Sequence, residues 1–155
     1  MENTTITLIS VLATLASTIA AAISAMQAYR ANKIIEKSNR NCAYQRLIDN
    51  LNIILQLGIQ YPYFEDKKFT SQWTMYKNSN DEKYMRYDNY CNLIYNYWHD
   101  VYNFFDGNRA EIENYLDIKN WIRTHEYNWS NPVEEYENLD GYDKEFRDFI
   151  NYYIK

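Results

Sequence analysis

The chain has 155 residues, with 16 Lys and Arg against 21 Asp and Glu, and a formal net charge of −5. This length accommodates one compact domain with an appendage and excludes two ordinary domains. Only three glycines and two prolines interrupt the sequence, so helix-ending signals are scarce and an all-α protein is predicted.

The charge is unevenly distributed along the chain. Residues 30–60 hold five Lys and Arg against two acids, whereas residues 61–155 hold eleven against eighteen. A mostly acidic globular part argues against nucleic acid as a partner, because phosphates need a basic face. The two cysteines, Cys42 and Cys91, form no CxxC pair and have no histidine cluster beside them. Neither a disulfide framework nor a zinc site is indicated, and no cofactor is expected.

The first predicted element is a membrane span over residues 1–29. The 27 residues between Glu2 and Arg30 carry no formal charge, and the apolar part from about Thr5 to Ala28 is long enough to cross the ~30 Å hydrocarbon layer. The start, MENTT, lacks the positive charge of a secretory signal, which favours an uncleaved anchor. Because threonines and serines dilute the hydrophobicity, a buried or interfacial helix and a cleaved signal stay open as alternatives.

Basic residues follow the predicted span and none precedes it. The juxtamembrane set is Arg30, Lys33, Lys37 and Arg40. The positive-inside rule then predicts a single-pass protein of the inner, cytoplasmic membrane, with its N-terminus outside and its C-terminal domain in the cytoplasm. These side chains also favour contact with the anionic lipids of the bilayer.

Small residues recur every four positions in the predicted span, a pattern that lets two membrane helices approach closely. The residues expected to pack are Ser10, Thr14, Ser17, Thr18, Ala21 and Ala22. A homo-oligomer formed through the span is therefore predicted.

The helix is expected to continue past the span into a cytoplasmic helical bundle over residues 30–155. Apolar residues at three- and four-residue steps predict a first bundle helix over 30–58, which Gly58 and Pro62 end. Residues 61–80 contain mixed charge and many aromatics, and they predict a connector that plugs the end of the bundle, or alternatively a lid over a ligand.

Residues 81–155 are expected to form the remaining helices of a bundle of four to five segments. Asp81 is a predicted N-cap, Gly107 ends that helix, and Asn108 with Glu111 has the spacing of a capping box for a helix that fades near Tyr127. Pro132 marks another helix start, and the last helix uses apolar positions from Tyr142 to Tyr153.

No catalytic signature is present. His99 is predicted at the edge of the bundle, and His125, next to Glu126, is predicted to bond the carbonyls at a helix end. The carboxylates predict a solvated face and no metal site, and no glycine-rich phosphate loop occurs.

The segments QAYRANKIIEKSNR and YPYFED, with the overall layout, resemble a loose group of uncharacterised small bacterial single-pass membrane proteins. The resemblance implies a membrane-tethered helical domain and supplies no catalytic residues. The function predicted is a membrane-anchored, non-enzymatic interaction or scaffold module that presents its bundle to an unidentified cytoplasmic protein. The alternatives are a membrane-perturbing effector of a toxin or phage-defence system, acting through oligomerisation of its span, and an enzyme with an unrecognised site.

Overall fold

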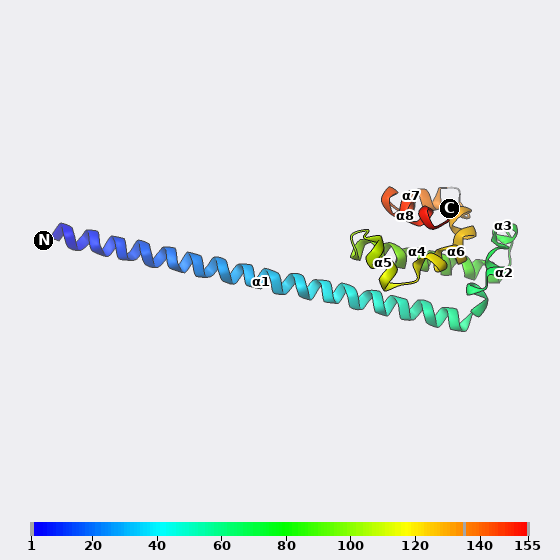
Figure 1. Ribbon diagram of the computed structural model, residues 1–155, viewed down its shortest axis with the longest axis horizontal. Coiled ribbons are helices and arrows are strands. Elements are labelled where there is room, and N and C mark those ends of the chain that lie inside the picture. Colours follow the sequence, from blue (N-terminus) through cyan, green and yellow to red (C-terminus); the bar gives the residue numbers. More distant parts are fainter. Residues whose placement is uncertain (1, 135, 155) are drawn as a thin grey trace. The chain divides into compact units, whose positions relative to one another are not determined.

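A computed structural model describes residues 2–134 and 136–154, with side chains described from Thr14 onward except at position 139. Over these residues the predicted all-α class is confirmed (Figure 1). The elements are α1 (Glu2–Gln60), the 3₁₀ helix η1 (Pro62–Glu65), α2 (Lys67–Thr70), α3 (Trp73–Tyr76), α4 (Glu82–Phe104), α5 (Arg109–Tyr115), α6 (Ile118–Ser130), α7 (Glu137–Gly141) and α8 (Lys144–Ile154). The chain forms two compact units, residues 1–43 and 44–155.

The first unit is made of the long helix α1. This helix runs without interruption from Glu2 to Gln60, and its last turns belong to the second unit. The predicted continuity past Arg30 is confirmed, but the helix passes Gly58, which was expected to end it. Every residue from 14 to 42 is exposed. The predicted domain boundary after residue 29 lies within this helix and stays a prediction.

The predicted membrane span requires a correction. Within the part of the chain that the structure describes, no helix is both long enough and apolar enough to cross a membrane. Serines, threonines and Gln27 lower the hydropathy of the uncharged stretch from Thr14 to Tyr29. The start of the predicted span, including Ser10, lies outside the described side chains. The predicted single-pass location in the inner membrane is contradicted by this finding.

The second unit has one core, to which α1, α4, α6 and α8 all contribute. Leu47 and Ile54 of α1 belong to this core, and the buried positions of α4 recur at three- and four-residue steps as predicted. The largest fully buried side chains are Trp73, Trp98, Tyr87, Tyr95, Tyr97, Phe146, Ile54, Ile94, Ile112, Ile118, Ile122 and Ile150. Aromatic side chains therefore fill most of the space between these helices.

The local capping signals are confirmed. Asp81 accepts a hydrogen bond from the Lys83 N–H at 2.9 Å and begins α4. Asn108 and Glu111 bond each other at the start of α5, with the Asn108 amide donating to the Glu111 carboxylate at 3.0 Å. Such contacts join residues two or three positions apart, so a sequence pattern is sufficient to predict them.

The helix predicted from Asn108 to Tyr127 is instead two helices. Leu116 is extended between α5 and α6, and the carboxylate of Asp117 caps α6 through the Asn120 N–H. A further helix was expected to begin near Pro132, whereas α7 begins only at Glu137. At both places, the spacing of apolar residues along the sequence does not mark where a helix begins or ends.

The connector over residues 61–80 contains η1, α2 and α3. Its aromatic side chains plug the bundle, as expected: Phe64 and Trp73 are buried, and the Trp73 indole N–H donates to the Asn131 carbonyl at 2.7 Å. This long-range bond fixes the connector against the end of α6.

Candidate functional site

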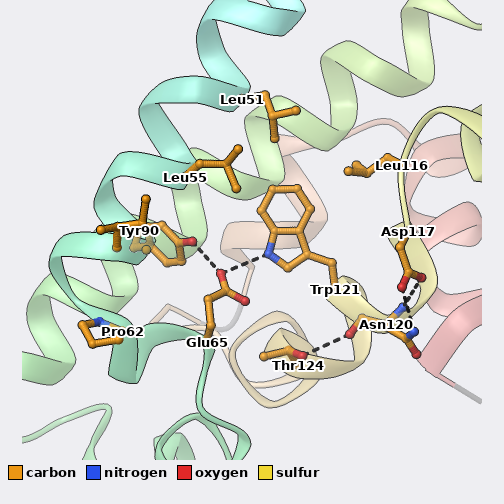
Figure 2. A pocket seen from close by; sticks show the side chains of 12 residues that line it. Leu51, Leu55, Pro62, Glu65, Tyr90, Leu116, Asp117, Asn120, Trp121 and Thr124 are labelled. Carbon is orange, nitrogen blue, oxygen red and sulfur yellow. Dashed lines mark hydrogen bonds between the residues drawn. The ribbon is translucent and has the colours of Figure 1, made fainter.

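One candidate site is a pocket of about 780 Å³ in the second unit (Figure 2). Its walls come from the last turns of α1, the connector, α4 and the junction of α5 with α6. The lining residues are Leu51, Leu55, Gly58, Ile59, Pro62, Glu65, Tyr90, Leu116, Asp117, Asn120, Trp121 and Thr124. This volume is in the range of sites that hold small organic ligands.

The polar centre of the pocket is the carboxylate of Glu65, the last residue of η1. Its Oε1 accepts hydrogen bonds from the Tyr90 hydroxyl at 2.5 Å and from the Trp121 indole N–H at 3.2 Å. Figure 2 shows Glu65 between these two rings. Trp121 and His125 are four residues apart on α6, so one face of that helix presents both to Glu65.

Burial is the largest influence on Glu65 and raises the pKa of its carboxyl. The nearby His125 ring, with the Tyr90 and Trp121 hydrogen bonds, outweighs that effect and leaves the pKa below its usual value. Glu65 is therefore ionised at neutral pH. Its side chain is 38% exposed, which leaves part of the carboxylate open to a ligand.

His125 lies behind the carboxylate and is completely buried. Its Nε2 is 3.5 Å from Glu65 Oε1, and its Nδ1 is 3.0 Å from the Tyr87 hydroxyl. Burial raises the Tyr87 pKa, so that hydroxyl is neutral. The predicted position of His125 at a helix end is therefore wrong, because tertiary packing turns the ring into the core.

The pocket contains no activated nucleophile among the residues described. Cys91 is close to His125, with Sγ 3.9 Å from Nδ1, but it is completely buried and burial raises the pKa of its thiol. The Thr124 hydroxyl donates to the Asn120 carbonyl of its own helix at 3.0 Å. No group of three acids, histidines or cysteines within the described ranges could hold a metal ion.

His99 lies at the bundle edge, as predicted. Its Nε2 is 3.0 Å from the Asp143 carboxylate, and Asp143 also accepts a hydrogen bond from the Phe146 N–H at 2.8 Å. The Phe146 N–H and then His99 lower the pKa of Asp143. This pair joins α4 to the start of α8 and does not face the pocket.

The residues expected to pack in the span lie on exposed turns of α1, as far as their side chains are described. The Ser17 hydroxyl donates to the Thr14 carbonyl and the Thr18 hydroxyl to the Leu15 carbonyl, both at 2.8 Å. Ala21 and Ala22 are exposed as well. Helix pairing through this set stays a prediction.

The basic residues after the predicted span are also exposed. Arg30, Lys33, Lys37 and Arg40 follow one another along α1, and the Lys33 ammonium is 5.5 Å from the centre of the Tyr29 ring. Their predicted contact with a bilayer stays a prediction.

The apolar face of α1 was not recognised from the sequence. Large side chains follow one another at three- and four-residue steps and are about half exposed. They are Leu15, Ile19, Ile23, Met26 and Tyr29. At about 100° per residue they fall within an arc of about 120°, while alanines and hydroxyl residues occupy the remaining faces.

Comparisons with family models, curated proteins and solved structures gave no match. The resemblance to small bacterial membrane proteins therefore stays a prediction.

Proposed function

We propose that this chain is a non-enzymatic helical binding module whose ligand occupies the pocket beside Glu65. The observation that carries the proposal is an ionised carboxylate in a pocket whose walls are mostly apolar. Leu51, Leu55, Ile59 and Leu116 supply apolar walls, and hydrogen bonds hold Glu65 in one orientation. Apolar walls with a few fixed polar groups are the usual construction of a ligand site.

The absence of an accessible nucleophile near Glu65 favours binding over catalysis. Cys91 is buried behind Tyr87 and His125, and the hydroxyl of Thr124 is bonded to its own helix. Glu65 itself is held ionised and has no second carboxylate free to share a proton, since Asp117 is bonded to Asn120. Acid catalysis would need a carboxyl with a raised pKa.

Titration of the full chain with the neutral fluorescent probe N-phenyl-1-naphthylamine tests this proposal. We expect saturable binding of one probe per chain. Gly58→Leu should weaken it at least about tenfold, because a Cβ at Gly58 points toward Tyr90 and Glu65 with contacts of 3.5 and 3.8 Å. Gly141→Leu is the matched control, since a Cβ there meets nothing within 4 Å. Probe binding that is absent, or equal in both variants, contradicts the proposal.

A second role, self-association, is favoured by the exposed apolar face of α1. Leu15, Ile19 and Ile23 are each about half exposed on a stretch without charge. An isolated helix rarely leaves a continuous apolar stripe uncovered. A second copy of the chain supplies a matching uncharged face of the same length, so we take it as the partner. A membrane-perturbing effector would need a span, and none of the described helices is long and apolar enough to form one.

Disulfide cross-linking of the full chain tests self-association. In a Cys42→Ser background, Ile19→Cys should give a covalent dimer on oxidation. Ser24→Cys is the control, because residues 19 and 24 are about 140° apart on the helix. Equal cross-linking at both positions, or none at position 19, would show that this face does not pair with itself.

A further inference from the structure

The charged residues that line the pocket all have one sign. Glu65 and Asp117 are acidic, and no lysine or arginine belongs to the lining. Asp117 is already engaged, because its carboxylate accepts from the Asn120 N–H and, at 2.9 Å, from the Asn120 side-chain amide. Glu65 is therefore the carboxylate available to a ligand.

The two oxygens of Glu65 have different surroundings. Oε1 accepts from Tyr90 and Trp121 and faces Nε2 of His125. None of the side chains that the structure describes donates a hydrogen bond to Oε2. A molecule bound in the pocket would exclude water from this oxygen. Burial of a carboxylate oxygen without a donor costs free energy, unless the bound molecule itself supplies that donor.

His125 lies against the same oxygen as Tyr90 and Trp121. Its ring is completely buried, and its Nε2 is 3.5 Å from Glu65 Oε1 without a hydrogen-bond partner in the described part of the chain. Tyr87 contacts the other ring nitrogen, Nδ1, at 3.0 Å. The contacts that the described side chains make with the carboxylate therefore gather at Oε1 and leave Oε2 to a ligand.

We propose that the pocket binds a primary alkylamine, with its ammonium group on Oε2 of Glu65. The ammonium supplies the missing donor in a charge-assisted hydrogen bond. The hydrocarbon chain then lies along Leu51, Leu55 and Leu116. An anion would be repelled by Glu65, and a neutral hydrocarbon would leave Oε2 without a partner. The inference rests on the proposed binding role of the pocket.

Competition against bound N-phenyl-1-naphthylamine in the full chain tests the ligand class. Hexylamine, 1-hexanol and hexanoate share one chain length and differ in the head group. We expect hexylamine to bind at least about tenfold more tightly than 1-hexanol, the effect of one hydrogen bond to a charged group. Hexanoate should bind most weakly. These three measurements need no variant, so they stay decisive even where a substitution disturbs folding.

Variants then locate the ammonium group. Glu65→Gln should reduce hexylamine binding to the level of 1-hexanol and leave 1-hexanol unchanged. Glu134→Gln removes the same charge from an exposed position outside the pocket and should leave both affinities unchanged. An equal loss in the two variants would show that the preference for amines comes from overall charge and would overturn the assignment.

The remaining outcomes separate the two proposals. Equal binding of hexylamine and 1-hexanol overturns the amine assignment and leaves the binding role of the pocket intact. Failure of the probe and of all three compounds overturns both. Tenfold tighter binding of the capped peptide acetyl-Ala-Lys-Ala-amide than of hexylamine overturns the assignment to a free amine, since the ammonium would then come from a protein.

Discussion

At the scale of single residues, Glu65 is where the connector, α4 and α6 meet. Tyr90, Trp121 and His125 all direct polar atoms to one of its oxygens. The three contacts span 25, 56 and 60 positions along the chain. Because donors from α4 and α6 hold this carboxylate, they fix the connector in place as well as one wall of the pocket.

The lowered pKa of Glu65 predicts how the stability of the fold depends on pH. Its carboxylate is stabilised in the folded state, so it contributes stability above the unfolded pKa of about 4.3. That contribution is lost as the pH falls through the lower pKa of the folded state. Glu65→Gln should therefore flatten the loss of stability below about pH 4, as measured by urea unfolding at a series of pH values.

The control for this prediction is Glu134→Gln, which removes one exposed carboxylate. It should keep the acid-induced loss seen in the unmodified chain. If Glu65→Gln loses stability on acidification as steeply as the control, the hydrogen bonds to Glu65 do not stabilise its ionised form.

At the scale of elements, the turn after α4 depends on backbone conformations that few residues adopt. Asp106 and Gly107 both have positive φ, 50° and 69°. The Gly107 N–H donates to the Tyr102 carbonyl at 2.8 Å and ends the helix. This left-handed ending is the usual role of a glycine after a helix, so the predicted stop at Gly107 is confirmed.

Gly107→Ala should destabilise the protein by about 2 kcal/mol or more. The left-handed conformation costs an alanine about 1–2 kcal/mol, and its Cβ would lie 2.9 Å from the Tyr102 ring. Gly141→Ala, where a Cβ meets nothing within 4 Å, should change stability by less than about 1 kcal/mol. Chemical denaturation of both variants measures the difference, and similar stabilities would show that the turn tolerates a side chain.

How far the elements follow from sequence depends on how local their signals are. The caps at Asp81 and Asn108 join near neighbours and were predictable. The break at Leu116 interrupts an apolar pattern that continues on both sides, so no local signal marks it. The pocket was not predictable either, because its carboxylate and its histidine meet only once α6 packs on the connector.

At the scale of the whole molecule, the two units differ in what they bury. Among the side chains that the structure describes, the buried apolar ones begin at Leu47 and all belong to residues 44–155. Residues 14–42 contribute none of them, although they form an unbroken helix. A helix of this kind obtains little stability from packing within its own chain, which agrees with a role in pairing with another molecule.

This division predicts that residues 44–155 fold when produced alone. The fragment keeps Leu47 and Ile54 on the remaining turns of α1, together with every other buried apolar side chain that the structure describes. We expect a cooperative thermal transition and the aromatic circular dichroism of packed tryptophans.

Fragment 61–155 is the matched control. It lacks Leu47 and Ile54, whose loss costs about 2–5 kcal/mol each, against a total stability of about 5–15 kcal/mol for an ordinary domain. The shorter fragment should therefore unfold without a cooperative transition. If both fragments fold equally well, α1 is not part of the core. If neither folds, residues before Tyr44 stabilise the bundle.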